Sequence, residues 1–242
     1  MQPTVIERLL AFKLFRWLYL LRKVFLTRAS RRYWSQYGED IVLDRVLNLG
    51  KPGFYVDVGC YHPVKNNNTF KLYRRGWRGI NLDIDELKIA AFHMRRPRDL
   101  SIACCVSDQP GDIRVFTPGP WSLTQTADAA TAEKMRARGV RLVERTVAAR
   151  PLTGILDGSE FRGRLIDVLS IDVEGHELAV LRSLEFDRYQ PRVVIIESHH
   201  RSLEELMCSE EFKFLVARGY TLFNWTGPSV LFLRKTPVKE GG

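Results

Sequence analysis

The stretch Gly53-Phe-Tyr-Val-Asp-Val-Gly-Cys-Tyr-His-Pro63 decides the fold, together with its counterpart Leu165-Ile-Asp-Val-Leu-Ser-Ile-Asp-Val-Glu-Gly-His-Glu177. Each opens with a short apolar, β-branched run, which predicts a buried parallel strand. Each run ends at carboxylates followed by a glycine. In an open α/β sheet, polar residues at the carboxyl ends of strands face the crevice where small molecules bind. We therefore predict cofactor residues in the first stretch (Asp57, Gly59) and reaction residues in the second (Asp172, Glu174).

Charge is distributed unevenly along the 242 residues, whose hydrophobic content of 45% suffices for one substantial core. Residues 1–34 hold eight of the 37 Lys and Arg but only one of the 28 acids, so most of the net charge of +9 lies there. The remainder is nearly neutral, which argues against a nucleic-acid partner. We expect two parts, a basic N-terminal helix within residues 1–34 and one domain over 35–242.

The N-terminal part reads as an amphipathic helix from Val5 to Phe25. Basic residues interrupt its apolar positions, so no run approaches the roughly 20 residues that cross a bilayer. The same interruptions break a signal-peptide core and predict cytoplasmic residence. Two roles stay open. The helix could lie peripherally on the inner face of an anionic membrane, or it could pack on its own domain or on a second subunit of a homo-oligomer.

The four cysteines show neither metal-ligand spacing nor a disulfide framework, which is typical of a reduced cytoplasmic protein. We expect all four to be small buried residues.

Strands and helices alternate through the body of the chain. After the first strand, further strands are predicted at Ile80–Ile84, Leu100–Ser107, Leu165–Ile171 and Arg192–Ser198, and two more at Tyr220–Trp225 and Val230–Leu233 form an antiparallel hairpin. An insertion over residues 111–150 interrupts this alternation of strands and helices and would form a wall of the substrate site. This order predicts an α/β fold with a seven-stranded, mostly parallel sheet, helices on both faces and a C-terminal hairpin, as in class I (Rossmann-like) methyltransferases.

The first glycine loop favours S-adenosylmethionine (SAM) over a dinucleotide. A dinucleotide needs the spacing Gly-x-Gly-x-x-Gly, whereas Tyr61 stands at the second glycine position here. SAM has no phosphates. It is suited by a site with one close glycine, an acid near its amino acid end and an acid for its ribose. Asp83 would take the ribose and Asp108 the adenine amino group. The full set of predicted cofactor contacts is Asp57, Gly59, Cys60, Asp83, Ile84, Ser107 and Asp108.

The combined motifs resemble the FkbM family of SAM-dependent methyltransferases. The segments that carry the resemblance are Ser35-Gln-Tyr-Gly-Glu-Asp40, Val56-Asp-Val-Gly-Cys-Tyr-His-Pro63, Asn68-Thr69, Arg75-Gly-Trp-Arg-Gly-Ile-Asn81, Val106-Ser-Asp108 and Ser170-Ile-Asp-Val-Glu-Gly-His-Glu177. The resemblance implies a class I fold and O-methylation of a hydroxyl, often on a sugar, glycolipid or polyketide-type product. By position it implies cofactor contacts at Asp57, Gly59, Asp83 and Asp108, and an acidic motif beside the reaction centre at Asp172, Glu174 and His176.

Methyl transfer to an alcohol needs an in-line arrangement and removal of the hydroxyl proton. We expect Asp172 and Glu174 to position the acceptor, with His176 or His199 as proton acceptor. Alternatively, Asp172, Glu174 and Glu197 could hold Mg²⁺, which acidifies the hydroxyl. Simpler roles stay open: Glu174 and His176 could cap the following helix, and His199 with His200 could form a solvated loop.

Two further functional classes compete with a methyltransferase acting on a small-molecule or glycan hydroxyl. One is a non-catalytic cofactor-binding or scaffold protein, tethered through residues 1–34 to a membrane or a glycan-assembly complex. The other is nucleic-acid methylation, which is disfavoured because no Asn/Asp-Pro-Pro-aromatic motif occurs.

Overall fold

The structure is a computed structural model that describes residues 9, 12–26, 32–47, 51–122 and 124–235. By its internal contacts the chain divides into two units, Met1–Arg32 and Tyr33–Gly242. Each unit is described separately.

The first unit contains helix α2 (Lys13–Phe25), and most of its large apolar side chains are exposed. Its predicted start at Val5 lies outside the described residues. The last turn carries Arg22 and Lys23, which favour a helix C-terminus because they complement its dipole. Searched over the described residues, the chain has no helix with the length and apolar character needed to span a bilayer. Contact of this helix with a membrane or with protein stays a prediction.

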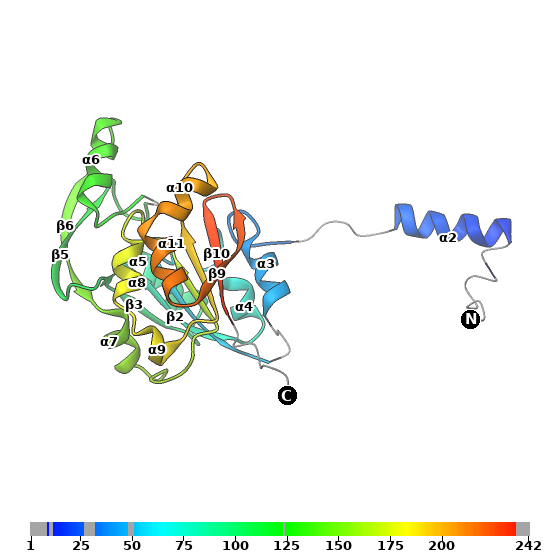
Figure 1. Ribbon diagram of the computed structural model, residues 1–242, viewed down its shortest axis with the longest axis horizontal. Helices are drawn as coiled ribbons and strands as arrows, with labels where there is room; N and C mark the ends of the chain where they lie inside the picture. Colours follow the sequence, from blue (N-terminus) through cyan, green and yellow to red (C-terminus); the bar gives the residue numbers. More distant parts are fainter. Residues whose placement is uncertain (1–8, 10–11, 27–31, 48–50, 123, 236–242) are drawn as a thin grey trace. The chain divides into compact units, whose positions relative to one another are not determined.

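The second unit is built on a seven-stranded sheet with the order β3-β2-β1-β7-β8-β10-β9 (Figure 1). Its strands are β1 (Phe54–Val58), β2 (Arg78–Asp83), β3 (Leu100–Ala103), β7 (Val168–Ile171), β8 (Val193–Glu197), β9 (Tyr220–Thr226) and β10 (Ser229–Arg234). The first five run parallel, and β9 and β10 form the antiparallel hairpin beside β8. The predicted fold class is confirmed. Because β1 lies between β2 and β7, the strand order reverses there and opens a crevice at the carboxyl ends.

Side-chain alternation along the strands gives the sheet an apolar layer on each face. In β1, Tyr55 packs with α3 (Glu39–Val46) and α4 (Phe70–Arg74), whereas Val56 and Val58 pack on the opposite side. That opposite layer draws apolar residues from α7 (Leu152–Asp157), α8 (Glu177–Arg182), α9 (Phe186–Tyr189), α10 (Leu203–Cys208) and α11 (Glu210–Ala217). Helix α5 (Glu86–Arg95) packs against β2 and β3. The helices therefore cover both faces, as predicted.

The insertion forms a second sheet with the order β4-β6-β5, built from β4 (Cys105–Val106), β5 (Gly111–Thr117) and β6 (Val143–Arg150). The strand predicted over Leu100–Ser107 is therefore two strands, interrupted at Cys104. Its second part leaves the main sheet to pair with β6. Helix α6 (Ala129–Ala137) follows β5, and in Figure 1 this group lies on the opposite side of the second unit from β9 and β10.

Two smaller expectations need correction. The helix predicted from Leu203 to Ala217 is broken at Ser209, because the Ser209 hydroxyl accepts a hydrogen bond from the Phe212 N–H and caps the second helix. The break leaves Cys208 exposed at the end of α10, so the prediction of a buried residue is wrong there. The other three cysteines are buried, as expected.

Candidate functional site

A cavity of about 290 Å³ lies at the carboxyl ends of the central strands, where the strand order reverses. Strands β1, β2, β4 and β8 and the loop after β7 contribute, and the insertion and the segment before α3 complete the wall. The residues that border it are Gln36, Val58, Gly59, Tyr61, Asn66, Leu82, Asp83, Ile84, Lys88, Cys104, Cys105, Val106, Thr124, Gln125, Ala127, Asp172, Val173, Glu174, His176 and Glu197. Segments far apart in sequence thus meet in one space, as the strand-end acids predicted.

Gly59 borders the cavity and is in the left-handed region, with φ of 76°. A Cβ atom at this position would lie 1.7 Å from the backbone oxygen of Asp172. Only glycine therefore allows the loop after β1 to approach the end of β7 so closely. The sequence predicted that the backbone at Gly59 approaches a ligand closely. In the structure this glycine also lets the loop after β1 pack directly against the acidic motif after β7.

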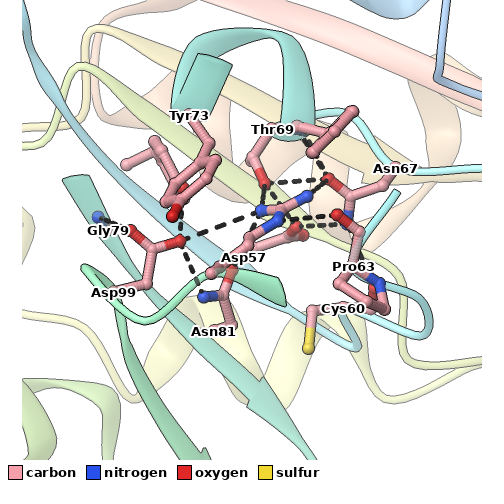
Figure 2. A network of polar contacts seen from close by, with 12 residues as sticks. Asp57, Cys60, Pro63, Asn67, Thr69, Tyr73, Gly79, Asn81 and Asp99 are labelled. Atoms are coloured by element: carbon pink, nitrogen blue, oxygen red, sulfur yellow. Dashed lines mark hydrogen bonds and ion pairs between the residues drawn. The ribbon is translucent and has the colours of Figure 1, made fainter. Parts of the chain in front are cut away.

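Asp57 lies in a buried polar network rather than on the cavity wall. Its carboxylate accepts hydrogen bonds from Asn67 Nδ2 at 3.0 Å and Thr69 Oγ1 at 2.8 Å, and Figure 2 shows these three residues converging. Desolvation raises the pKa of Asp57, and the nearby Arg96 opposes that rise. Arg96 is fully buried and donates to Pro63 O at 2.7 Å and to Asn67 Oδ1 at 2.5 Å. This network fixes the loop that carries Gly59, and a direct contact of Asp57 with cofactor stays a prediction.

Asp83 and Ile84 border the cavity at the end of β2. The Asp83 carboxylate accepts from the backbone N–H groups of Tyr61 at 3.1 Å and Asp85 at 2.9 Å, and from Lys88 Nζ at 3.4 Å. These bonds hold the acid at the cavity edge with its charge partly compensated. Cys60 is buried beside α5 instead of bordering the cavity.

The third strand contributes different residues from those predicted. Among the described residues that border the cavity, Cys104, Cys105 and Val106 stand in place of Ser107 and Asp108. The interruption at Cys104 explains this difference, because Ser107 already follows the second sheet and donates its N–H to Arg150 O at 3.2 Å. The adenine contact predicted for Asp108 stays a prediction.

The loop after β7 presents Asp172, Glu174 and His176 to the cavity. Glu174 is in the left-handed region, with φ of 54°, which is uncommon for a residue with a side chain. The Thr126 hydroxyl of the insertion donates to Glu174 O at 2.7 Å and helps to hold this conformation. Backbone strain of this kind is characteristic of functional sites.

The side chains of Glu174 and His176 do not cap the following helix, α8. Glu177 accepts the N–H groups of Val173 at 3.2 Å and Gly175 at 3.1 Å, which leaves Glu174 to face the cavity. Within the described residues, the His176 side chain makes no capping hydrogen bond to α8. Desolvation lowers the pKa of His176, against the opposing charges of Asp108 and Asp128, so the ring is neutral near pH 7.

Acidic groups gather at the ends of β7 and β8. Desolvation raises the pKa of Asp172 to about 7 and that of Glu174 to about 6. Desolvation, followed by the charge of Asp172, also raises the pKa of Glu197. A hydrogen bond within the Asp172–Glu197 pair favours the charge on Asp172 and the proton on Glu197. The cavity wall thus holds two carboxyl groups, Asp172 and Glu174, whose pKa values lie close to neutral pH.

His199 lies beside this group, although its side chain is mostly exposed. Its Nε2 lies 3.8 Å from Glu174 Oε2 and 3.6 Å from Glu197 Oε2. One ligand atom from each of these three residues lies within 4.8 Å of the others. Of the predicted Mg²⁺ ligands, Glu174 and Glu197 belong to this compact group, whereas Asp172, although it lies next to Glu197, does not. Mg²⁺ prefers oxygen ligands in an octahedral arrangement, so two carboxylates and an imidazole fit it poorly.

Three buried polar atoms in the cavity wall have no hydrogen-bond partner within the described part of the chain: Gln125 Oε1, His176 Nε2 and Glu197 Oε2. Unpaired buried polar atoms are costly, so a bound ligand is the natural partner. Our sequence reasoning missed Gln36, Lys88 and Gln125. Gln36 belongs to a segment that carried the family resemblance, whereas nothing in the insertion marked Gln125.

One family model matches more than half of the chain. Residues 57–222 match the family model described as the Methyltransferase FkbM domain. No curated protein matched. Two similar solved structures are a TehB-like SAM-dependent methyltransferase from Corynebacterium glutamicum (11% identity, 91% of this chain and 95% of that chain covered, TM-score 0.42) and a methyltransferase from Geobacter sulfurreducens (14% identity, 96% and 91% covered, TM-score 0.42).

Proposed function

Since the chain belongs to the FkbM family of SAM-dependent methyltransferases, we propose that it transfers the methyl group to a hydroxyl oxygen of a sugar, glycolipid or related natural product. The observation that carries this proposal is the group of carboxyls that border the cavity at the ends of β7 and β8, Asp172, Glu174 and Glu197. Burial raises the pKa of Asp172 and of Glu174 toward neutrality. A hydroxyl must lose its proton to become a good nucleophile, and a base that titrates near neutral pH is suited to take it.

The residues present fit SAM through its uncharged nucleoside and its amino acid end. Gly59 gives a close backbone approach, Asp83 offers a carboxylate to the ribose hydroxyls, and cavity atoms without partners are available to hydrogen-bond. When bound, SAM supplies an electrophilic methyl group on a sulfonium. The protein's own task is to hold the acceptor oxygen in line and to exclude water.

Proton removal is assigned to the acidic motif. Asp172 and Glu174 orient the acceptor hydroxyl, and an ionised carboxylate or the neutral ring of His176 accepts the proton. His199 Nε2 lies within 4 Å of both Glu174 and Glu197, so its ring can receive the proton from either carboxyl. Because the three-residue group fits Mg²⁺ poorly, no step of this mechanism is routed through a metal.

The function is tested by incubating the full-length protein with methyl-labelled SAM and hydroxyl-bearing acceptors, among them glycosides and glycolipids. We expect label in an alkali-stable ether of the acceptor. Label in an amine, or in nucleic acid but no glycan, would contradict O-methylation. A protein that binds SAM but transfers no label to any acceptor would favour the scaffold alternative.

Metal independence is tested in the same assay with EDTA. We expect a change in rate smaller than about twofold, because the proton acceptors are side chains already on the cavity wall. A large loss that Mg²⁺ restores would contradict this assignment and would reinstate the carboxylates as metal ligands.

A further inference from the structure

The insertion borders one side of the cavity through a short segment, described over residues 119–122 and 124–128. The N–H of Trp121 donates to Asp85 Oδ2 at 2.7 Å, which ties the segment to the end of β2. At its other end Thr126 donates to Glu174 O at 2.7 Å, which ties it to the acidic motif. Between these two anchors lies Gln125, so this side chain is held on both sides by elements of the site.

Gln125 is a buried polar side chain that faces the cavity. It is 8% exposed and borders the space next to the β2 end. Its Nε2 donates to Asp85 Oδ2 at 3.2 Å and more weakly to Gly119 O at 3.5 Å. Its Oε1 has no partner among the residues that the structure describes.

The orientation of the amide follows from the chemistry of Asp85. An ionised carboxylate only accepts hydrogen bonds. Desolvation acts to raise the pKa of Asp85, yet hydrogen bonds from Trp121, Leu87 and Gln125 keep it below its usual value. The NH₂ group must therefore face Asp85, and rotating the amide would place two acceptors against each other. The acceptor oxygen is then left without a partner among the described residues.

We propose that Gln125 Oε1 accepts a hydrogen bond from the nucleoside of the bound cofactor, and that the insertion thereby takes part in cofactor recognition. This inference rests on the proposed function. Gln125 is bonded to Asp85, two residues after the predicted ribose acid Asp83, so it lies on the nucleoside side of the site. The nucleoside offers two kinds of donor at this place, the adenine amino group and the ribose hydroxyls.

The test is calorimetry on the full-length protein with S-adenosylhomocysteine and three analogues, which lack the adenine amino group, the 2′-hydroxyl or the 3′-hydroxyl. In the wild type, removal of the donor that meets Gln125 should weaken binding about tenfold. In Gln125→Met, binding of S-adenosylhomocysteine should weaken to a similar degree. The analogue that lacks the donor to Gln125 should then bind this variant as tightly as S-adenosylhomocysteine does. The analogue concerned identifies the donor as amino group or hydroxyl.

Two variants separate recognition from folding. Gln125→Glu keeps an acceptor oxygen but loses the donor to Asp85 and sets two carboxylates side by side, so it should bind S-adenosylhomocysteine less tightly than the wild type. Gln109→Met changes an exposed glutamine outside the cavity and should behave as wild type. If Gln125→Met does not fold, Gln125→Leu takes its place.

The inference would be overturned if each analogue bound Gln125→Met more weakly than S-adenosylhomocysteine by the same factor as in the wild type. Loss of a side chain that only supports the loop weakens the binding of every ligand equally. That result leaves the proposed function intact. A wild-type protein that does not bind S-adenosylhomocysteine would instead refute the proposed function and this inference together.

Discussion

Asp172→Asn and Glu174→Gln are each expected to lower methyl transfer by roughly 100-fold or more, because general-base and positioning groups contribute on that order. Both side chains border the cavity, and desolvation raises both pKa values toward neutrality. The amides keep the shape of the side chains but cannot accept a proton at neutral pH. Affinity for SAM should change little, since the nucleoside side of the cavity is untouched. Single-turnover rates and calorimetry on each variant measure the two quantities.

The pH dependence of the wild-type rate of methyl transfer tests the assignment of these carboxylates as the base in a second way. A base must be ionised to work, so the rate should rise as pH increases through the interval from about 6 to about 7 that the Glu174 and Asp172 pKa values define. The sign is opposite for stability: the folded protein binds more protons than the unfolded chain in this range, so ionisation of Asp172 destabilises it. Asp172→Asn should therefore be no less stable than wild type at pH 8.

Asp187→Asn is the matched control, because Asp187 is exposed on α9 and lies outside the cavity wall. It should leave the rate and its pH profile unchanged. Full activity in both Asp172→Asn and Glu174→Gln would remove the acidic motif from the chemistry. An acid limb near pH 4, typical of unperturbed carboxyls, would show that the base is a different group.

Gly59→Ala is expected to cost the protein both stability and activity. The added Cβ would lie 1.7 Å from Asp172 O, whereas real Cβ contacts are not shorter than 3.0 Å, so the end of β7 must move by about 1.3 Å or more. A displacement of about 1 Å at a reaction centre costs on the order of 100-fold in rate. The left-handed conformation adds about 1–2 kcal/mol of strain. Thermal unfolding and methyl transfer should both show the loss.

Gly219→Ala separates strain from collision. Gly219 has nearly the same φ, +81° against +76°, but an added Cβ would meet no described atom within 4 Å. It should lower stability by about 1 kcal/mol and leave methyl transfer unaffected. Equal activity losses in the two variants would show that backbone strain, and not the approach of the two loops, explains the requirement for glycine.

The fold was predictable because local patterns and global packing agree. The apolar runs of β1, β7 and β8 are buried along almost their whole length, and each ends where the sequence places its acid. Their order in the chain, with helices between them, admits few topologies. The convergence of Asp83, Asp172, Glu174 and Glu197 on one cavity follows from that topology alone, since parallel strands end at one edge.

Other parts of the site depend on contacts that no local pattern carries. Asp57 has the position of a cofactor acid, yet Asn67 and Thr69 bind its carboxylate. Thr69 belongs to a segment that carried the family resemblance, but nothing in that segment indicated its bond to Asp57. The interruption at Cys104 depends on pairing with β6, more than 40 residues later. Gln125 reaches the cavity only because Asp85 and Glu174 anchor its loop from both sides.

The central claim is that the strand-end acids surround one SAM molecule, with room beside it for an alcohol. A crystal structure of the protein with S-adenosylhomocysteine tests this most directly. We predict the ribose beside Asp83, the sulfur on the cavity side of Gly59, and open space toward Glu174 and Glu197. A nucleoside bound outside this cavity, or a nicotinamide dinucleotide retained within it, would contradict the account.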